Sequence, residues 1–337
     1  MAYKVILTYD VGPTDIEERA LAEVGAELIK ADWKTEDDLV RICRDTDAVA
    51  VLIGPGVPIT KRVIDAMPNL KILSRLGIGV DNIDVEAATA RGIPVSVVLD
   101  YCISEVSDHA MAFILAFARR IMPLSQAVKA GHWTKGRSDI PTTRTPMFRL
   151  SKVTLGVVGV GRIGSSLATK ARAFGMRVIA YDPYLSKDRL DIELVDFNRL
   201  LSESDFISLH APLTKETKHL FNIETFRRMK RTAYLINNAR GGLVDEHALY
   251  TALKEGYIAG VGLDVTDPEP PEAGNPLLNL DNVFITGHSS WYSEEAVAEL
   301  RLKSVAAIIE VLKGRRPLTL ANPEVKKQAA EDRLLGH

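Results

Sequence analysis

The sequence predicts an α/β protein built from two domains, each with a doubly wound parallel sheet. The chain has 337 residues, more than the roughly 100 to 200 that are usual for one domain. Short β-branched apolar runs alternate with helical segments along most of the chain, as in sheets whose parallel strands are joined by crossover helices. A glycine-rich turn also lies near the middle of the chain, between a predicted strand and a predicted helix.

The composition is that of an ordinary globular protein. Hydrophobic residues make up 46% and charged residues 26%, and the net charge of −2 leaves no basic excess that would attract nucleic acid or anionic lipid. The N-terminal segment MAYKVILTYDVG is typical of a buried strand, and no apolar run reaches about 18 residues. Two cysteines, Cys43 and Cys102, are too few for a disulfide framework and lack a metal-binding spacing. We expect a cytoplasmic protein with no nucleic-acid, membrane or metal partner.

The first hundred residues predict four strands joined by helices. The strands are expected at KVILTY, AVAVLI, LKILSRL and IPVSVV, and the helices near residues 15–24, 60–67 and 85–91. A long amphipathic stretch from about residue 104 to 130 then leads toward the second domain. It is interpreted as a connecting core helix, with a subunit contact as a further possibility. The polar segment GRSDIPTTRTP that follows predicts a surface loop.

A nucleotide-binding unit is predicted to begin at Val153. The apolar run VTLGVVGV enters a turn with Gly159, Gly161 and Gly164, and a helical stretch leads away from it. Such glycines permit a tight turn, close approach of a pyrophosphate and close helix–strand packing, while the helix N-terminus supplies N–H donors. Asp182 closes the next apolar run and would accept hydrogen bonds from a ribose 2′-OH but repel a 2′-phosphate. The flanking strand, helix and acid favour a Rossmann site for NAD, rather than NADP, over a simple glycine-rich turn.

The remaining strands of this domain end in polar segments. Strands are predicted at DFISLH, TAYLIN, YIAGVGL and NVFIT, with helices near residues 196–202, 223–229 and 246–255. Ligands of open α/β sheets bind beyond the carboxyl ends of the strands. The candidates there are Arg240 after TAYLIN, the acidic proline-rich loop 264–271 after YIAGVGL, and His288 after NVFIT.

These side chains suit hydride transfer between an alcohol carbon and nicotinamide. His288 can take the hydroxyl proton and return it, and Glu269 is the loop acid best placed to fix the tautomer of its imidazole. The planar fork of Arg240 suits a substrate carboxylate. Taken singly, each residue also has a plainer interpretation: Arg240 as a surface ion-pair partner, Glu269 as a solvated acid and His288 as a structural histidine.

Two further segments bear on ligands. His210 opens HAPLT directly after a strand, so we expect it to border the adenosine of the cofactor. In the first domain, the segment LGIGVDNID follows a strand and offers glycines for an anion-binding nest, or else forms a structural turn capped by Asp81. Arg75, just before it, would add a second cation for the substrate.

The motifs GVGRIGSSLA, LINNARGGLVDEHAL, GLDVTDPEPP and GHSSWYSEEA occur together, and the chain to about residue 320 resembles the D-isomer-specific 2-hydroxyacid dehydrogenases. The resemblance implies Arg240, Glu269 and His288 as the catalytic trio. It also implies a set of residues around the NAD: Gly159, Gly161, Arg162, Ile163, Gly164, Asp182, His210, Ala211, Pro212, Thr217, Asn238, Ala239, Arg240, Asp264 and His288. For the substrate, it implies that the backbone N–H groups of Ile78 and Gly79 donate to the carboxylate.

The same resemblance implies the domain organisation. A flavodoxin-like substrate domain of residues 1–103 and 294–337 would carry an inserted Rossmann domain of residues 104–293, and the protein would be a homodimer with the helix near Ser104 contributing. The segments WYSEEA, RLGIGVDNID and DYCISEVSDHA look most similar to the branch related to C-terminal-binding proteins. In that branch Trp291 and Arg75 would line the substrate site, which suits a 2-keto acid with an apolar tail. One departure is Gly287, where many members have proline.

The leading hypothesis is an NAD(H)-dependent enzyme that interconverts D-2-hydroxy acids and 2-keto acids. One alternative is a corepressor-like binding protein that senses NAD(H) with the same site. Another is hydride transfer from a different small donor such as phosphite or formate.

Overall fold

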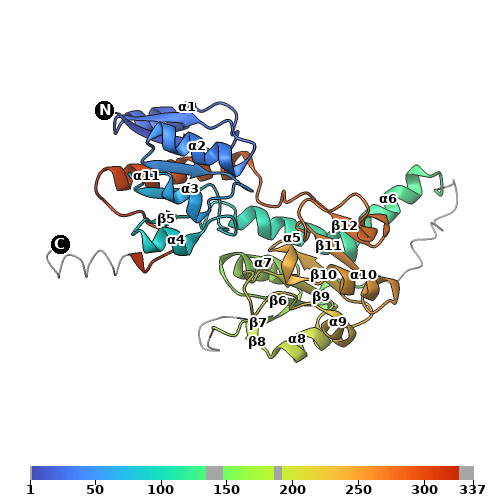
Figure 1. The fold of residues 1–337 in the computed structure, drawn as a ribbon. Helices are drawn as coiled ribbons and strands as arrows, with labels where there is room; N and C mark the ends of the chain where they lie inside the picture. The colour runs from blue at the N-terminus through green and yellow to red at the C-terminus, as the bar shows by residue number, and fades with distance from the viewer. Residues whose placement is uncertain (1, 134–146, 186–191, 326–337) are drawn as a thin grey trace. The chain divides into compact units, whose positions relative to one another are not determined.

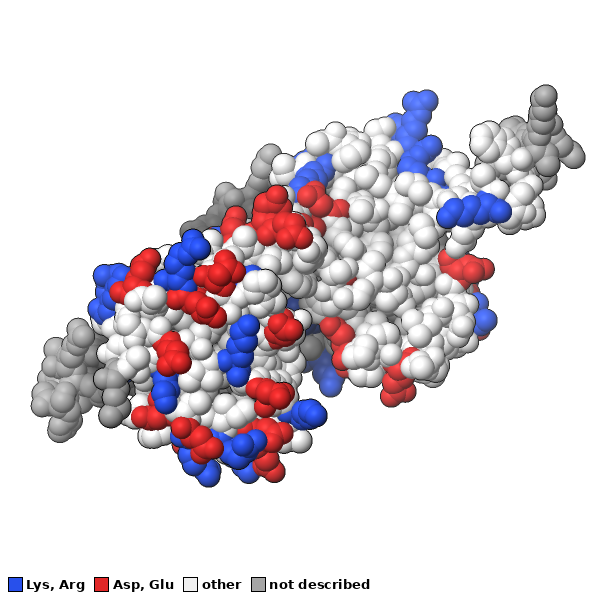
Figure 2. All heavy atoms as spheres, turned by 90° about the horizontal axis from the view of Figure 1, so that it is seen from above, with Lys and Arg blue, Asp and Glu red and all other residues white. Residues whose placement is uncertain are grey.

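The computed structural model describes residues 2–133, 147–185 and 192–325, and the chain forms two compact units (Figure 1). Unit 1 comprises Met1–Tyr101 and Ser293–His337, and unit 2 comprises Cys102–Tyr292. Unit 2 is therefore inserted into the sequence of unit 1. Figure 2 shows acidic and basic side chains interspersed on one face of the molecule. The loop predicted at GRSDIPTTRTP lies outside the described residues.

Unit 1 contains a parallel five-stranded sheet in the order β2-β1-β3-β4-β5, which is the flavodoxin-like order. Its strands are β1 (Tyr3–Leu7), β2 (Ala26–Lys30), β3 (Ala50–Ile53), β4 (Ile72–Arg75) and β5 (Val95–Ser96). Its helices are α1 (Asp15–Ala22), α2 (Glu36–Thr46), α3 (Lys61–Asp65), α4 (Val85–Ala90) and α11 (Glu294–Leu312). Strand β2 was not among the strands predicted from the sequence.

Helix α11 returns the chain to unit 1. The Ser293 hydroxyl caps its N-terminus by accepting a hydrogen bond from the backbone N–H of Ala296. On α11, Arg301 forms a bidentate ion pair with Glu17 of α1, with both N–O distances 2.6 Å. The side chains of Arg301 and Glu17 are only 11% and 1% exposed. This buried pair joins segments 284 residues apart in sequence.

Unit 2 contains a parallel seven-stranded sheet in the order β12-β11-β10-β9-β6-β7-β8. Its strands are β6 (Thr154–Val158), β7 (Arg177–Tyr181), β8 (Glu193–Leu194), β9 (Phe206–Leu209), β10 (Tyr234–Asn237), β11 (Gly260–Leu263) and β12 (Val283–Ile285). Its helices are α5 (Ile103–Ala118), α6 (Ile121–Lys129), α7 (Arg162–Ala173), α8 (Phe197–Glu203), α9 (Ile223–Arg228) and α10 (Glu246–Lys254). Six neighbouring strands follow the Rossmann order, with the direction of winding reversing between β6 and β9. The fold class predicted from the sequence is confirmed.

The amphipathic stretch from residue 104 to 130 is two helices rather than one. Arg120 has a φ of 50°, in the left-handed region, and the helices α5 and α6 meet at an angle of 58°. Helix α5 packs against α7 and β10 and buries one face, whereas none of the residues of α6 is buried. Within the described ranges no single helix is long and apolar enough to cross a membrane, although α5 and α6 together meet that criterion by length and composition.

Candidate active site

The three glycines of the turn after β6 meet different surroundings. Gly159 has a φ of 88°, and a Cβ atom there would lie 2.8 Å from the backbone nitrogen of Ala211. A Cβ atom on Gly164 would lie 2.2 Å from the carbonyl oxygen of Gly159. A Cβ atom on Gly161 would have no neighbour within 4 Å. Protein packing therefore requires the first and third glycines, whereas the second borders open space in front of α7.

This open space is suited to a dinucleotide phosphate. Helix α7 begins at Arg162, and its N-cap Gly161 supplies no side chain to cap the first N–H groups of the helix. Asp182 at the end of β7 accepts hydrogen bonds from the backbone N–H groups of Val160 and Tyr184, both at 3.0 Å. Its carboxylate thus lies beside the glycine turn, where an adenosine ribose would be expected. Arg162 is exposed and Ile163 half-buried at the same helix terminus.

The segment after β9 borders the glycine turn from the neighbouring strand. His210 forms a 2.8 Å hydrogen bond with the Ser208 hydroxyl through Nε2, and burial lowers the pKa of its imidazole to about 4. The ring is therefore neutral near pH 7. Beyond Ala211, the Thr217 hydroxyl donates to the carbonyl of Pro212 at 2.7 Å and closes the loop.

After β10, the side chain of Asn237 braces the segment that carries Arg240. Its amide nitrogen donates to the Arg240 carbonyl at 2.8 Å, and its amide oxygen accepts from the N–H of Ala239 at 3.1 Å. Arg240 also donates to the Ala239 carbonyl at 2.7 Å. The side chain of Asn238 is buried, and neither of its polar atoms has a hydrogen-bond partner among the described residues. Buried amides are normally paired, so this one fits a bound ligand with polar groups.

Asp264, at the end of β11, organises the loop that follows β12. It is 1% exposed, and its carboxylate accepts hydrogen bonds from the Thr286 hydroxyl and from the backbone N–H groups of Ser289 and Ser290. Burial alone would raise the pKa of Asp264, but these hydrogen bonds outweigh it and hold the pKa below its ordinary value. The backbone carbonyl of Asp264 accepts the N–H of His288 at 2.8 Å. Asp264 therefore holds three consecutive residues of this loop.

His288 and Glu269 form a direct pair. The distance between Nδ1 of His288 and Oε1 of Glu269 is 2.5 Å, and the two side chains are 44% and 41% exposed. A carboxylate can only accept a hydrogen bond, so Nδ1 carries the proton and Nε2 of the neutral ring is left able to accept one. His288 has a φ of 49°, a conformation that a non-glycine residue keeps only when its surroundings hold it. The neighbouring Gly287 has open space around its Cβ position.

The residues expected to bind substrate are divided between the units. Arg75, Ile78 and Gly79 belong to unit 1, whereas Trp291 belongs to unit 2 with Arg240, Glu269 and His288. The Arg75 guanidinium donates to the carbonyls of Gly79 at 3.0 Å and Ile53 at 3.1 Å, so it braces its own loop. No described residue accepts a hydrogen bond from the backbone N–H of Ile78 or Gly79. Trp291 contacts Tyr292 edge-on, with ring centroids 5.8 Å apart.

Two residues near the catalytic candidates were not singled out from the sequence. Thr286 donates to Asp264 at 2.6 Å, and His109 of α5 lies 3.1 Å from the Thr286 hydroxyl. The position of Thr286 at a strand end was a usable signal. His109 gave none, because its spacing within a helical pattern does not reveal which strand the helix packs against.

Comparison with known proteins decides the family. A family model described as "D-isomer specific 2-hydroxyacid dehydrogenase, NAD binding domain" matches residues 111–290, which is more than half of the chain. The chain belongs to this family. This match and the relatives and solved structures described next confirm the expected NAD cofactor and the expected activity class, an NAD-dependent oxidoreductase of 2-hydroxy and 2-keto acids.

Curated relatives of this dehydrogenase carry several substrate names. A glyoxylate reductase from Korarchaeum cryptofilum is 39% identical, with 93% of this chain and 95% of the relative covered. A hydroxypyruvate reductase from Thermotoga maritima is 38% identical, with 89% of this chain and 96% of the relative covered. A D-3-phosphoglycerate dehydrogenase from Methanocaldococcus jannaschii is 41% identical over 90% of this chain, which spans only 57% of that longer protein.

Solved structures show the same fold. A glyoxylate reductase from Paecilomyes thermophila is 29% identical and has a TM-score of 0.85, with 96% of this chain and 99% of that chain covered. A D-lactate dehydrogenase from Aquifex aeolicus, solved with NAD and lactic acid, is 30% identical and has a TM-score of 0.79, with 92% of this chain and 96% of that chain covered.

Proposed function

We propose that this dehydrogenase is an NADH-dependent reductase of small 2-keto acids, with glyoxylate and hydroxypyruvate as the first candidates. The 2.5 Å pair of His288 and Glu269 carries the proposal, because it supplies a proton donor and acceptor in the same unit as the dinucleotide turn. Two curated relatives whose lengths match this chain are named for these two keto acids. The phosphoglycerate dehydrogenase is a longer protein, which makes its substrate a weaker candidate.

The residues act on different parts of the substrate. When bound, NADH supplies the hydride for the carbonyl carbon. His288 gives the proton on Nε2 to the carbonyl oxygen and takes it back in the reverse direction. Glu269 accepts from Nδ1 in both protonation states, so the ring keeps its orientation. Arg240 binds the substrate carboxylate with its guanidinium and polarises the adjacent carbonyl.

The same proposal assigns the binding residues. NAD is held by the glycine turn, by Asp182 at the ribose and by the buried amide of Asn238. The other cofactor residues that were predicted from the sequence surround the NAD. The substrate carboxylate also receives the backbone N–H groups of Ile78 and Gly79, which have no described acceptor in the protein. Arg75 and Trp291 stay proposed substrate contacts. The similarity to the C-terminal-binding-protein branch stays a separate proposal, and it favours a longer apolar tail than glyoxylate or hydroxypyruvate has.

A cytoplasmic homodimer is part of this proposal. Helix α6 supports a subunit contact, because it has no buried residue while Ile121 and Met122 are 52% and 47% exposed. Molar mass measured by light scattering tests the dimer, and a monomeric mass would exclude it.

An NADH-absorbance assay over a panel of keto acids tests the function. The panel contains glyoxylate, hydroxypyruvate, pyruvate and branched or aromatic keto acids, with 3-phosphoglycerate and phosphite tested with NAD in the oxidative direction. We expect the fastest turnover with glyoxylate or hydroxypyruvate. Tight NADH binding without turnover of any compound would instead favour the sensor hypothesis, and turnover of phosphite alone would favour the other donor class.

Variants then test the residues. His288→Ala should abolish turnover while NADH binding, followed by its fluorescence, is retained. Arg240→Ala should mainly raise KM for the keto acid. His247→Ala on the exposed surface of α10 is the matched control and should behave as the parent protein does. Near-normal kcat for His288→Ala would overturn the assignment of His288.

A further inference from the structure

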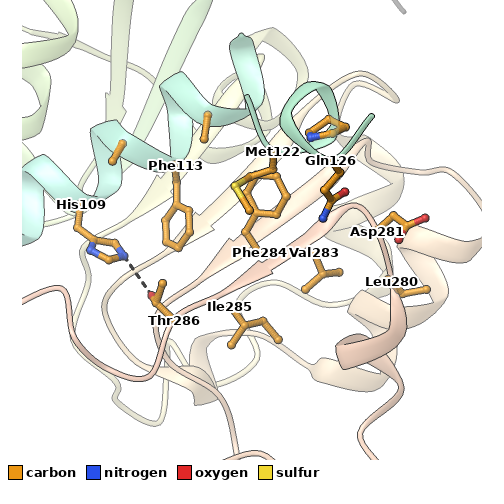
Figure 3. Close-up of a pocket in the computed structure, with 13 residues that line it drawn as sticks. His109, Phe113, Met122, Gln126, Leu280, Asp281, Val283, Phe284, Ile285 and Thr286 are labelled. Carbon is orange, nitrogen blue, oxygen red and sulfur yellow. Dashed lines mark hydrogen bonds between the residues drawn. The ribbon is translucent and has the colours of Figure 1, made fainter. Parts of the chain in front are cut away.

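A chain of hydrogen bonds links helix α5 to the loop that carries His288. Nε2 of His109 lies 3.1 Å from the hydroxyl of Thr286, the bond that is dashed in Figure 3. That hydroxyl lies 2.6 Å from Oδ1 of Asp264. Oδ1 and Oδ2 of Asp264 accept the backbone N–H groups of Ser289 and Ser290 at 2.9 and 3.0 Å. Three elements far apart in sequence thus converge on one buried carboxylate.

The direction of each hydrogen bond follows from the chemistry of the groups. The Asp264 carboxylate is an acceptor, so the single proton of the Thr286 hydroxyl is directed toward it. Toward His109 the same hydroxyl can then only accept. Nε2 of His109 must therefore carry a proton, and the imidazole donates into the chain.

This arrangement acts on His288 through the backbone. The peptide N–H of His288 is bound to the carbonyl of Asp264, and the two residues after it are bound to the Asp264 carboxylate. His288 is thereby kept in a left-handed conformation with a φ of 49°. A rotation of the Asp264 carboxylate would release Ser289 and Ser290 and allow the His288 side chain to turn away from its working direction.

His109 is itself held in place. Its ring packs edge-on against Phe113, with the ring centroids 4.9 Å apart. Both residues line a pocket of about 510 Å³ between α5, α6 and β12, in which the dashed bond to Thr286 is visible (Figure 3). The ring is therefore fixed by Phe113 on one side, and the pocket gives room for a replacement side chain of similar size.

We propose that Thr286 and His109 are positioning residues for the reaction: His109 orients the Thr286 hydroxyl, which holds the Asp264 carboxylate that fixes the backbone around His288. This inference rests on the proposed role of His288 as the acid–base residue. It assigns to α5 a part in catalysis, although α5 contributes no residue to the proposed acid–base pair.

The first test removes only the hydroxyl of Thr286. Thr286→Val is close in shape to threonine, and we expect kcat for keto-acid reduction to fall by about tenfold to a hundredfold, as for a displaced catalytic group. KM for the keto acid should stay within about twofold, because the contacts of Arg240 are unchanged. Thr286→Ser, which restores the hydroxyl, should recover most of kcat. Thr251→Val on α10 is the control for loss of a threonine hydroxyl that donates to a helix carbonyl.

The second test asks whether His109 acts through Thr286. His109→Leu should lower kcat in the parent protein but have little further effect in Thr286→Val, since the hydroxyl it orients is then absent. His109→Gln keeps a side-chain donor and should retain more activity than His109→Leu. Equal effects of His109→Leu in both backgrounds would overturn the link.

The outcomes separate this inference from the proposed function. Normal kcat in Thr286→Val, together with an inactive His288→Ala, would overturn the inference and leave the role of His288 intact. If the fraction of Thr286→Val molecules that bind NADH fell in proportion to kcat, Thr286 would only stabilise the fold. That result would also overturn the inference. An active His288→Ala would contradict the proposed function itself.

Discussion

Replacing Glu269 with glutamine removes a negative charge from the proposed catalytic pair while preserving its geometry. The amide oxygen of the introduced glutamine can still accept the proton on Nδ1 of His288, so the tautomer and the ring orientation are kept. What is lost is the attraction between the carboxylate and the imidazolium that forms when His288 holds the substrate proton. Glu269→Ala removes both the charge and the acceptor, so the two variants separate electrostatics from orientation.

The contact distance and the exposure of the pair set the magnitude. The charges of an imidazolium and a carboxylate are delocalised, so their centres lie farther apart than the 2.5 Å contact between Nδ1 and Oε1. Two unit charges about 4 Å apart attract by about 1 kcal/mol in water and about 4 kcal/mol at an effective dielectric constant near 20. With side chains 44% and 41% exposed, solvent screening places the value in the lower part of this range, at about 1 to 2 kcal/mol. If that energy is lost from the transition state for hydroxyacid oxidation, the rate falls by about five- to thirtyfold for Glu269→Gln. Glu269→Ala also frees the ring, and its loss should be on the order of a hundredfold.

Oxidation of the hydroxy acid by NAD, measured at saturating concentrations of both substrates, gives the relevant rate. Glu272→Gln, in the same loop and exposed, is the matched control and should leave the rate unchanged. If Glu269→Gln kept the full rate while Glu269→Ala lost it, Glu269 would act by orientation alone. If both variants kept the full rate, the pair would have no part in catalysis and the mechanism would be refuted.

Contacts within the two units lead to three further predictions. Gly161→Ala should keep the melting temperature of the parent protein but weaken NADH binding. Gly164→Ala should lower the melting temperature, because its Cβ would meet a carbonyl oxygen at 2.2 Å. Equal effects of the two variants on the melting temperature would contradict the distinction. Arg301→Met should lower the free energy of unfolding by about 3 to 5 kcal/mol, measured by urea denaturation, because Glu17 stays buried without its partner, and adding Glu17→Gln should restore part of the loss. Burial lowers the pKa of His210 to about 4, so the unfolded chain binds the proton first as the pH falls below about 6.5. The free energy of unfolding should therefore decrease between pH 6.5 and 4 by on the order of 3 kcal/mol. His210→Gln should flatten that dependence in denaturation curves measured at several pH values.

The sequence predicts the sheets and the strand ends well because both depend on local patterns. Apolar β-branched runs mark nearly all of the strands, and polar residues directly after them mark the edge where Arg240, Asp264 and His288 lie. The edge strand β2 was missed, since AELIK places charged residues in a strand that is only half buried. The break between α5 and α6 was also missed, because the arginines at the break favour helix. Pro123 carried the signal, since proline is tolerated in the first turn of a new helix but not in the interior of a long one.

The contacts within the site could be predicted only in part. The motif order brings Glu269 and His288 to neighbouring strand ends, yet their 2.5 Å contact depends on the path of the loop between them. The hydrogen bond between His109 and Thr286 spans 177 residues, and no spacing rule relates a helix position to a strand end at that separation. Burial was equally hidden for Asn238, whose unpaired amide became apparent only in the folded chain, among the residues that the structure describes.

The carboxylate of Asp182 also holds the glycine turn in place, and this matters for any change of coenzyme. By binding the peptide N–H of Val160, it stiffens the loop that we propose receives the diphosphate. Exchanging Asp182 for a small or basic residue, in order to make the enzyme accept NADPH, would remove this hydrogen bond together with the proposed repulsion of a 2′-phosphate. A successful redesign must therefore supply a new acceptor for the loop, or affinity for both coenzymes will fall.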